Sequence, residues 1–508
     1  MFKLIDKIID RITMYRLVLY YLIGLLLAAV ALSALAILPY APIAIIYSSL
    51  ILVVICWISN KVLGSLFKVS INIESSLITA LILALIISPP ESGQYLSVLP
   101  FYFLAGIVAM ASKFLINIGK KHIFNPAALA VAVTGIAIGA SASWWVGTAS
   151  LLPFVLIGGI LMLRKLRQFD LAVAFLIAVI LTTITIGSVN GHIVTSLLKA
   201  FSSSPLLFFV FVMLTEPLTM PPNRDGRIAY GVLVGMLFSP LVHFGQTYFS
   251  PELALLVGNV FAYLVSPKGR HVFVIKEVRE ASTGVFDFVM ETEKKFKFKA
   301  GQYMEWTLGH NKPDSRGNRR YFTLASSPTE SEVLLGVKFY ENSSSFKKEM
   351  LNLKPGDVIT AGQLAGEFTL PNNKEDKLAF IAGGIGVTPF RSMIKYLVDK
   401  NEKRDLKMLY SNRRIEEVAY WELFNQAYQQ LGFSTIYTLT DLDRIPEEWR
   451  GSRGFINAAM ISKEIPDFKE RKFYISGSHQ MVSAIKEELS QIGVSYKNIK
   501  TDFFPGLV

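Results

Sequence analysis

The first half of the chain contains a succession of long apolar segments, and this feature constrains the fold more than any other. Several segments approach the length of about 20 residues that a helix needs to cross a bilayer, and others are shorter. Backbone polar groups in lipid must be satisfied within the protein, so such spans are helical. We therefore predict an all-α polytopic membrane domain of about ten transmembrane helices over residues 1–266. The apolar segments lie near residues 17–37, 41–58, 75–89, 98–118, 126–140, 146–163, 171–188, 205–219, 228–244 and 251–266.

Basic residues gather in alternate connections between these segments, and the opposite connections contain only Lys199. Because cytoplasmic loops are enriched in Lys and Arg, this alternation predicts that the N-terminus and the C-terminal half are cytoplasmic, with the spans in the plasma membrane. The net charge of +12 is therefore better explained by basic residues at a membrane surface than by binding to nucleic acid. The first apolar run follows several basic residues without a signal-peptide cleavage pattern, so we expect a transmembrane helix there. The basic connections contain Lys61 and Lys68; Lys113, Lys120 and Lys121; Arg164, Lys165 and Arg167; Arg224 and Arg227; and Lys268 and Arg270.

Prolines interrupt the shorter apolar segments in pairs. They end the third and eighth segments at residues 86–90 and 218–222, and they open the fifth and tenth at residues 124–129 and 249–254. The members of each pair are five spans apart and therefore have opposite orientations, which is typical of an inverted repeat with broken helices. Such half-helices leave free backbone groups that can bind a ligand. The alternative is that the prolines only mark the ends of spans.

Glu216 is the acidic residue set most deeply among apolar neighbours in this region. A carboxylate within a membrane segment is a functional candidate: it could relay protons, coordinate a cation or accept a hydrogen bond from a flavin ring. It could equally cap the end of a span. The single cysteine, Cys56, excludes an internal disulfide and a cysteine-ligated iron–sulfur cluster, so redox chemistry would need organic cofactors or partners.

Three phrases in this half resemble a known family. They are Phe124-Asn125-Pro126-Ala127-Ala128, the stretch 213–219 around Glu216, and the stretch 226–231. They are similar to the B subunit of the sodium-pumping NADH:quinone oxidoreductase and the D subunit of the Rnf complex. The resemblance implies a flavin within the membrane, with Asn125 and Glu216 as candidate contacts. Many relatives esterify FMN to a Ser-Gly-Ala-Thr motif that this chain lacks, although residues 147–150 lie in the corresponding region. We therefore expect non-covalent FMN or riboflavin.

Acidic residues become dense after about residue 270, and the pattern changes to short β-type runs separated by turn residues. We predict an antiparallel β-barrel over residues 270–372. The turn at residues 354–357, Lys-Pro-Gly-Asp, supports this interpretation. The predicted strands are residues 272–278, 286–290, 303–308, 321–325, 334–340 and 358–361.

Residues 319–328 of this barrel have the components of a flavin site. Arg320 can bind a pyrophosphate with its guanidinium, Phe322 can cover an isoalloxazine ring, and Thr323 can approach the reactive ring edge. Lys338 offers a further positive charge. Small hydroxyls at a predicted helix start offer a phosphate site. The alternatives are an ordinary strand with a basic start and a serine helix cap without a ligand. The hydroxyls belong to Ser343, Ser344 and Ser345.

After residue 377 strands alternate with helices, which predicts an α/β domain over residues 377–508. Residues 378–390 form a buried strand that runs into a glycine turn and then a helix, a pattern that lets backbone approach a dinucleotide. Further strands are expected at residues 408–412, 434–440 and 473–476. Ligands of open α/β sheets bind at the carboxyl ends of strands, so these stretches should meet in one crevice. The candidate contacts are Gly383, Gly384, Gly386, Thr388, Pro389, Arg413, Gly477 and Met481.

Together these motifs resemble the ferredoxin–NADP reductase superfamily. The resemblance implies that residues 320, 322 and 323 hold FAD, helped by residues 338 and 343–345. It implies that NAD(P)H lies between the glycine turn and Gly477, with Phe322, Thr323 and Thr388 nearest the reacting atoms. Phe504 would lie near the isoalloxazine, with packing as the alternative. Arg413 could meet a 2′-phosphate or pair with Glu416 or Glu417, so NADH and NADPH are not distinguished.

The combined expectation is a membrane enzyme: an NAD(P)H-dependent, FAD-containing oxidoreductase. Electrons would pass from FAD through a membrane flavin to a quinone or to an extracytoplasmic acceptor protein, and further subunits are possible. A haem-type transmembrane reductase is an alternative, but His122, His192, His243 and His271 all lie near span ends. Another alternative is a transporter-like membrane domain regulated by a fused redox-sensing reductase domain.

Overall fold

The structure, a computed structural model, forms two compact units, Met1–Lys268 and Gly269–Val508, which are described separately. We call them the apolar unit and the reductase unit. The described residues are 12, 14–67, 71–118, 121–166, 168–190, 193–202, 205–238, 242–244, 247–266, 271–292, 296–310, 314 and 318–502.

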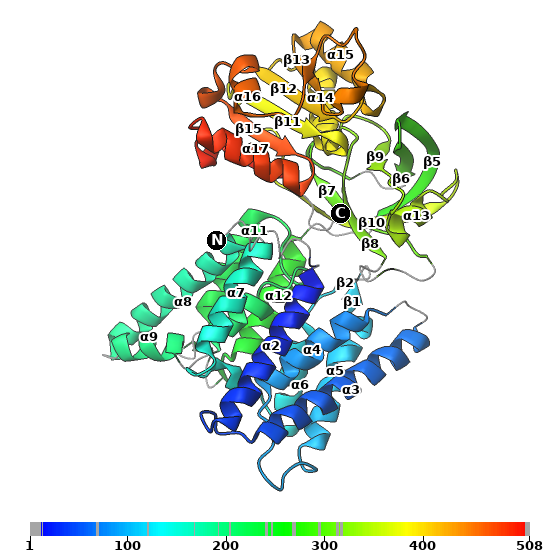
Figure 1. Cartoon of the computed structure of the whole chain (residues 1–508). Helices are drawn as coiled ribbons and strands as arrows, with labels where there is room; N and C mark the ends of the chain where they lie inside the picture. Colours follow the sequence, from blue (N-terminus) through cyan, green and yellow to red (C-terminus); the bar gives the residue numbers. More distant parts are fainter. Residues whose placement is uncertain are drawn as a thin grey trace. The chain divides into compact units, whose positions relative to one another are not determined.

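The apolar unit is built of helices (Figure 1), and each predicted apolar segment contains one. One predicted connection, residues 189–204, contains an additional helix, α9. It was missed because its apolar residues are separated by polar ones, including Lys199, and so do not form a long apolar run. The elements are α2 (Met14–Ala34), α3 (Pro42–Leu66), α4 (Ile73–Ile86), α5 (Leu99–Leu115), α6 (Pro126–Ile138), the 3₁₀ turn η1 (Trp145–Gly147), α7 (Leu152–Leu166), α8 (Phe169–Asn190), α9 (Ile193–Ser202), α10 (Leu206–Phe208) with the π-helical turn η2 (Phe209–Met213), α11 (Arg224–Leu237) and α12 (Pro251–Val265).

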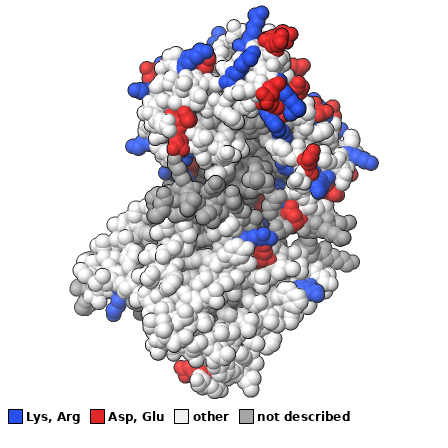
Figure 2. Space-filling model, in the orientation of Figure 1, with Lys and Arg blue, Asp and Glu red and all other residues white. Residues whose placement is uncertain are grey.

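Among the described residues, three helical stretches are long and apolar enough to cross a membrane: Met14–Ala34, Pro42–Leu66 and Phe169–Ile186. A fourth candidate joins α9 to residues 206–213 across a bend, and α4, α5, α6 and α12 are shorter apolar helices. The number of spans therefore stays a prediction. Large apolar side chains such as Leu27 and Ile157 are more than half exposed on the helix surfaces, as expected where lipid replaces water. Figure 2 shows few charged side chains over this unit on the face in view.

The two predicted breaks at residues 124–129 and 249–254 have the same local structure. Each follows a short antiparallel hairpin, β1 (Asn117–Ile118) with β2 (Lys121–His122) before α6, and β3 (His243–Phe244) with β4 (Thr247–Tyr248) before α12. Each helix then starts with a proline at its first turn, and the preceding Asn125 or Ser250 accepts a backbone N–H as N-cap. The helices α6 and α12 pack against each other.

The first part of the reductase unit is one six-stranded antiparallel sheet, as predicted from the alternating pattern. The strand order is β8-β7-β10-β5-β6-β9, and the core contains Phe273, Phe288, Trp306 and Phe346. The Ala325 N–H, just beyond the edge strand β8, donates to the Leu334 carbonyl of the other edge strand at 2.8 Å. Closure into a barrel stays a prediction. The elements are β5 (His271–Ser282), β6 (Val285–Thr292), β7 (Tyr303–Thr307), β8 (Arg319–Thr323), β9 (Val333–Lys338), α13 (Ser345–Met350) and β10 (Val358–Ala365).

The second part of the reductase unit is a six-stranded parallel sheet in the order β14-β13-β12-β11-β15-β16. Apolar clusters lie on both faces: Phe390 and Phe424 belong to one, and Ile461 and Val482 belong to the other. The four predicted strands are present, but β14 and β16 were missed because both are short and lie at the sheet edges. The elements are β11 (Leu378–Gly383), α14 (Thr388–Lys400), β12 (Leu406–Asn412), α15 (Trp421–Leu431), β13 (Ser434–Leu439), β14 (Ser452–Arg453), α16 (Ala458–Glu464), β15 (Lys472–Ser476), α17 (His479–Gln491) and β16 (Ile499–Asp502).

Candidate functional sites

The glycine turn lies at the carboxyl edge of the parallel sheet, between β11 and α14. Gly384 has φ +50°, a left-handed conformation that favours glycine. Residues 384–387 form one 3₁₀ turn, after which Thr388 and Pro389 start α14. Proline is tolerated there because its missing N–H would have no partner within the helix. The Thr388 hydroxyl donates to the Ile385 carbonyl at 3.2 Å, so it stabilises the turn.

Two glycines of this edge are closely approached by other atoms, and at Gly386 those atoms are backbone. A Cβ at Gly386 would lie 2.5 Å from the Ser476 carbonyl oxygen and 2.6 Å from the Gly477 Cα, which are backbone atoms that cannot rotate away. A Cβ at Gly383 would lie 2.0 Å from the Met481 Sδ. The structure therefore brings Gly383, Gly386, Gly477 and Met481 together at one sheet edge, as the sequence predicted.

Arg413 follows β12 at the same edge, and its side chain is 68% exposed. Its Nε lies 3.6 Å from Asp441 Oδ2, and the Arg414 Nε lies 3.0 Å from the same oxygen. Of the two alternatives for Arg413, pairing with Glu416 or Glu417 is therefore wrong, because β13 ends beside β12 and brings Asp441 there, and contact with a 2′-phosphate stays a prediction. The hydrogen bond from Arg414 lowers the pKa of Asp441, so the carboxylate is charged.

The predicted pyrophosphate contact, Arg320, holds a carboxylate. Its Nη2 lies 2.8 and 3.0 Å from the two oxygens of Asp314. The Ser345 N–H donates to Asp314 Oδ2 at 3.3 Å, and the Ser345 hydroxyl accepts the Asp314 N–H at 2.9 Å. The guanidinium also lies over the Phe346 ring, 5.3 Å from its centroid. Arg320 and Ser345 thus form an anion-binding site, which the Asp314 carboxylate occupies.

Phe322 and Thr323 lie at the end of β8. Phe322 is 9% exposed and packs 5.9 Å from Phe346, on the same strand face as Arg320. Thr323 is buried, and its register partner on β7 is Tyr303. The structure therefore places Arg320 and Phe322 together, as strand alternation predicts.

Lys338 and the serines are engaged with other protein groups. Lys338 Nζ pairs with Glu417 Oε2 at 2.5 Å, so its charge is shared with a carboxylate of the half that contains the parallel sheet. The Ser343 hydroxyl donates to the Tyr340 carbonyl at 2.7 Å, and the Ser344 side chain caps α13 by accepting the Lys347 N–H. The predicted flavin contacts at Lys338, Ser343 and Ser344 stay predictions. Phe504 lies outside the described residues.

The apolar unit contains a polar cluster at the first helix break. Asn125 Nδ2 donates to Glu216 Oε2 at 2.9 Å, and the Thr219 hydroxyl donates to the same oxygen at 3.1 Å. His122 Nε2 lies 3.2 Å from Glu216 Oε1. The two membrane candidates, Asn125 and Glu216, are therefore direct partners although they are 91 residues apart.

A second layer of this cluster was not predicted from the sequence. Asn259 is fully buried in α12, and its Oδ1 accepts the Asn125 N–H at 2.9 Å. Its Nδ2 donates to the Thr219 carbonyl and to the Tyr230 hydroxyl, both at 3.2 Å. An amide in the middle of the apolar run that follows the first turn of α12 was the available signal. We name His122, Asn125, Glu216, Thr219, Tyr230 and Asn259 the helix-break cluster.

A buried carboxylate, Glu252, lies in the first turn of α12 and was also missed. Its Oε2 accepts the Trp144 indole N–H at 3.2 Å, and Trp144 has φ +54°. The Trp144 backbone N–H donates to the Ile86 carbonyl at 2.9 Å, where α4 ends. Each of the two proline breaks that open a helix therefore has one carboxylate beside it.

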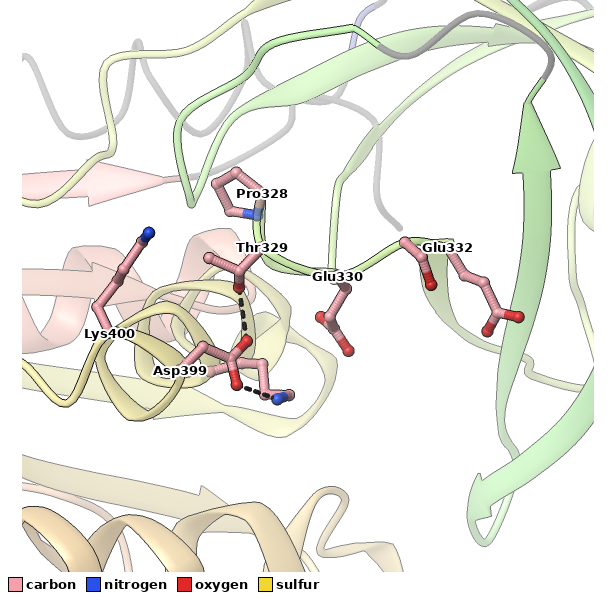
Figure 3. A pocket seen from close by; sticks show the side chains of 8 residues that line it. Pro328, Thr329, Glu330, Glu332, Asp399 and Lys400 are labelled. Carbon is pink, nitrogen blue, oxygen red and sulfur yellow. Dashed lines mark hydrogen bonds and ion pairs between the residues drawn. The ribbon is translucent and has the colours of Figure 1, made fainter.

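A surface cavity of about 690 Å³ lies away from these sites. It is formed by residues 328–332 and the last turns of α14, where the Thr329 hydroxyl donates to Asp399 (Figure 3). The glycine turn is at the opposite end of α14, so this cavity is not the nucleotide site.

Comparison with known proteins agrees with this division. Residues 138–270 match the NQR2, RnfD, RnfE family, and residues 380–487 match the oxidoreductase NAD-binding domain. The apolar unit therefore carries an NQR2, RnfD, RnfE family segment and the reductase unit an NAD-binding domain of the ferredoxin reductase type.

Among curated relatives, the glycine betaine monooxygenase reductase subunit of Chromohalobacter salexigens is 26% identical over 242 residues, which is 46% of this chain and 64% of that protein. The F component of the Na(+)-translocating NADH-quinone reductase of Psychrobacter cryohalolentis is 32% identical over 161 residues, which is 30% of this chain and 38% of that protein. Among solved structures, the flavohem-like FAD/NAD-binding domain of a Vibrio cholerae nitric oxide dioxygenase is 20% identical, with 46% of this chain and 98% of that chain covered and a TM-score of 0.41. The matched part is thus less than two thirds of the length of both of these curated relatives.

Proposed function

We propose that this chain, which joins an NQR2, RnfD, RnfE family segment to an oxidoreductase NAD-binding domain, is a membrane flavin oxidoreductase. It would take hydride from cytosolic NAD(P)H onto FAD. Electrons would then enter or cross the membrane through a second, membrane-bound flavin and reach a quinone or an extracytoplasmic acceptor.

The observation that carries the reductase half of the proposal is the anion held by Arg320 and the Ser345 N–H. The Asp314 carboxylate stands in for a phosphate. A carboxylate is planar and a phosphate is tetrahedral, but both are oxyanions that a guanidinium and a backbone N–H bind well. The donor set therefore fits the pyrophosphate of FAD. Arg320 and Ser345 would hold this group, and Phe322 and Thr323 would lie beside the isoalloxazine.

The glycine edge fits a dinucleotide for a steric reason. Gly386 has no room for a Cβ because the Ser476 carbonyl and Gly477 are so near, so the surface there is backbone. Backbone N–H groups at the start of α14 favour a phosphate. FAD, when bound, would accept a hydride and release single electrons. The protein would bind and orient FAD and NAD(P)H. Arg413, paired with Asp441, would lie beside the adenosine end of NAD(P)H.

In the apolar unit, we assign the second flavin to the neighbourhood of Asn125 and Glu216. The three side chains that contact Glu216 orient its carboxylate, and Glu216 keeps 24% of its side chain exposed. A partly exposed, oriented carboxylate can accept a hydrogen bond from a flavin ring N–H. Without a Ser-Gly-Ala-Thr motif the flavin would be non-covalent FMN or riboflavin.

The arrangement we propose has a transmembrane domain over residues 1–266 with about ten spans in an inverted repeat. A FAD-binding barrel over residues 270–372 and an NAD(P)-binding domain over residues 377–508 would follow, both cytoplasmic. The alternation of basic connections supports the orientation, and the similar helix breaks before α6 and α12 support the repeat. The family segment supports further subunits in a membrane complex.

A flavin inventory of the full chain in detergent tests both halves. Arg320→Ala should remove FAD while FMN or riboflavin stays, because only the pyrophosphate contact is lost. The matched control is Arg319→Ala, since Arg319 is the neighbouring arginine, lies on the other strand face and is 41% exposed. The control should keep both flavins.

Retention of FAD in the Arg320→Ala variant would refute the assigned flavin site. An apolar unit that holds no flavin in any variant would refute transmembrane electron transfer through a flavin, and a transporter-like domain with a redox-sensing reductase domain would replace it. Reduction of the bound FAD by NADH or NADPH in the wild-type protein tests the hydride step separately.

A further inference from the structure

The two halves of the reductase unit meet closely along the strands β6 and β9. Asp287 and Gly336 are register partners on these strands. A Cβ at Gly336 would lie 2.3 Å from the Tyr420 Oη and 2.9 Å from the Thr388 Cγ2. Only glycine therefore lets Thr388 and Tyr420 of the nucleotide-binding half approach the flavin-binding sheet. We call this contact between the halves the seam.

Tyr420 is held in the seam by a buried carboxylate. It has φ +61°, which a tyrosine rarely adopts, and its hydroxyl donates to Asp287 Oδ1 at 2.7 Å. Asp287 is 3% exposed, and the Arg279 Nε lies 3.9 Å from its other oxygen. Burial raises the pKa of Asp287; the Tyr420 hydrogen bond and the charges of Arg391 and Arg279 oppose this shift, and the charge of Glu330 adds to it.

A second set of bonds ties the same two halves together through α14. Arg391 Nη1 donates to the Ala325 carbonyl at 3.0 Å, and its Nη2 lies 2.9 Å from Glu330 Oε1 (Figure 3 shows Glu330). The Ser392 hydroxyl donates to the Ser326 carbonyl at 2.6 Å. These bonds join the segment that leaves β8 to the first turns of α14.

The seam is adjacent in the chain to the residues that would contact both cofactors. Ala325 closely follows Thr323 at the end of β8, and Arg391 closely follows Thr388 at the start of α14. A displacement at the seam would therefore also displace Thr323 and Thr388. Hydride transfer depends steeply on geometry, and a displacement of about 1 Å can cost on the order of 100-fold in rate.

We propose that Tyr420 and Asp287, seated against Gly336, are positioning residues that hold the nucleotide-binding half in register with the flavin-binding sheet. This inference rests on the proposed reaction between NAD(P)H and flavin. Neither residue exchanges the hydride or a proton with a cofactor. The hydrogen bond fixes Tyr420 over Gly336 of β9, where Thr388 also lies, and Thr388 starts the helix that faces the nucleotide.

Rapid-mixing kinetics on the full chain test the catalytic consequence. Tyr420→Phe should slow flavin reduction at saturating NAD(P)H about tenfold, with a larger deuterium isotope effect and a nucleotide dissociation constant within about twofold of wild type. Asp287→Asn keeps an acceptor oxygen and should have a smaller effect. The matched control is Tyr437→Phe, since the Tyr437 hydroxyl is also buried but takes no part in the hydrogen bonds described across the seam. It should leave the rate unchanged.

Hydrogen–deuterium exchange on flavin-depleted full chain gives a readout that needs no turnover. Tyr420→Phe and Gly336→Ala should both speed exchange in peptides covering residues 324–330 and 385–393. The double variant Gly336→Ala/Tyr420→Phe lacks the hydroxyl that the new Cβ would meet, so it should exchange more slowly than Gly336→Ala alone.

Wild-type exchange in Gly336→Ala, or wild-type reduction and exchange rates in Tyr420→Phe, would overturn the proposal. If Gly336→Ala fails to fold, Tyr420→Phe and Asp287→Asn still decide it. A wild-type protein whose flavin NAD(P)H does not reduce would instead refute the proposed function, while the exchange data would still report on the seam.

Discussion

In the apolar unit Glu216 and Glu252 lie where helices break, whereas in the reductase unit Asp287 and Arg391 lie along a seam between two sheets. Glu216 is bound by Asn125 and Thr219, and all three belong to helix ends that prolines interrupt. Asp287 and Arg391, in contrast, lie within a regular strand and a regular helix. Their partners are 133 and 61 residues away in the chain, across the seam.

The difference follows from which hydrogen-bonding groups each environment leaves without a partner. A broken helix in an apolar surrounding has free backbone N–H and C=O groups, so polar side chains must gather at the break. At the seam, Arg391 and Ser392 donate to backbone carbonyls of the opposite half, so its polar contacts serve to fix the two halves in one register. The helix-break cluster is therefore expected to stabilise one local structure, and the seam to couple two.

The largest expected effect is at the seam. Arg391→Ala removes the bidentate partner of Glu330, whose side chain is 22% exposed, and should lower the free energy of unfolding by about 2–3 kcal/mol, below the range for a fully buried pair. The comparison variant is Lys374→Ala, which breaks the Lys374–Glu402 pair; Lys374 is 63% exposed, so the cost should be below about 1 kcal/mol. Calorimetry of the full chain in detergent measures both. Equal losses would show that the seam pair is no different from a surface pair.

An intermediate effect is expected at the helix breaks. Asn125 caps α6 and also donates to Glu216, whereas Ser250 only caps α12. Asn125→Ala should therefore cost about 2 kcal/mol and Ser250→Ala about 1 kcal/mol. Asn125→Ala should also release the membrane flavin, which extraction measures. Similar costs, with the flavin kept in both variants, would show that Asn125 is only a cap.

The smallest effect is a pH dependence in the seam. Because the folded pKa of Asp287 is raised above its ordinary value, the folded state binds the proton more tightly than the unfolded state. The resulting stabilisation is fully present below the ordinary pKa and is lost as the pH rises through the raised value. The unfolding temperature of wild type relative to Asp287→Asn should therefore fall as the pH rises from about 4. A difference that stays constant with pH would contradict the raised pKa.

Much of the fold was predictable because its signals are local. The strands of the antiparallel sheet follow from alternation between turn residues, and the glycine turn from residues 383–389. Asn125 and Glu216 were identified separately, because single polar residues are conspicuous among apolar neighbours. The short edge strands β14 and β16 were missed because they have too few residues to show a pattern.

The partners of charged residues were less predictable. Lys338 pairs with Glu417, and Arg413 with Asp441. The sequence suggested a cofactor for the first, and either a 2′-phosphate or Glu416 or Glu417 for the second. Charged residues are frequent in the reductase unit, so many pairings are compatible with the same sequence. Which one forms depends on strand order and on the docking of the two halves.

The sequence by itself determined the division into an apolar and a reductase unit, the periodicity of each, and the glycines and prolines that turn the chain, because these depend on neighbouring residues. Only the tertiary structure decided that Asn259 and Tyr230 complete the helix-break cluster around Glu216, and that Tyr420 meets Asp287 over Gly336. Those contacts join residues that are distant in the chain, and they form only when packing brings specific surfaces within hydrogen-bond distance.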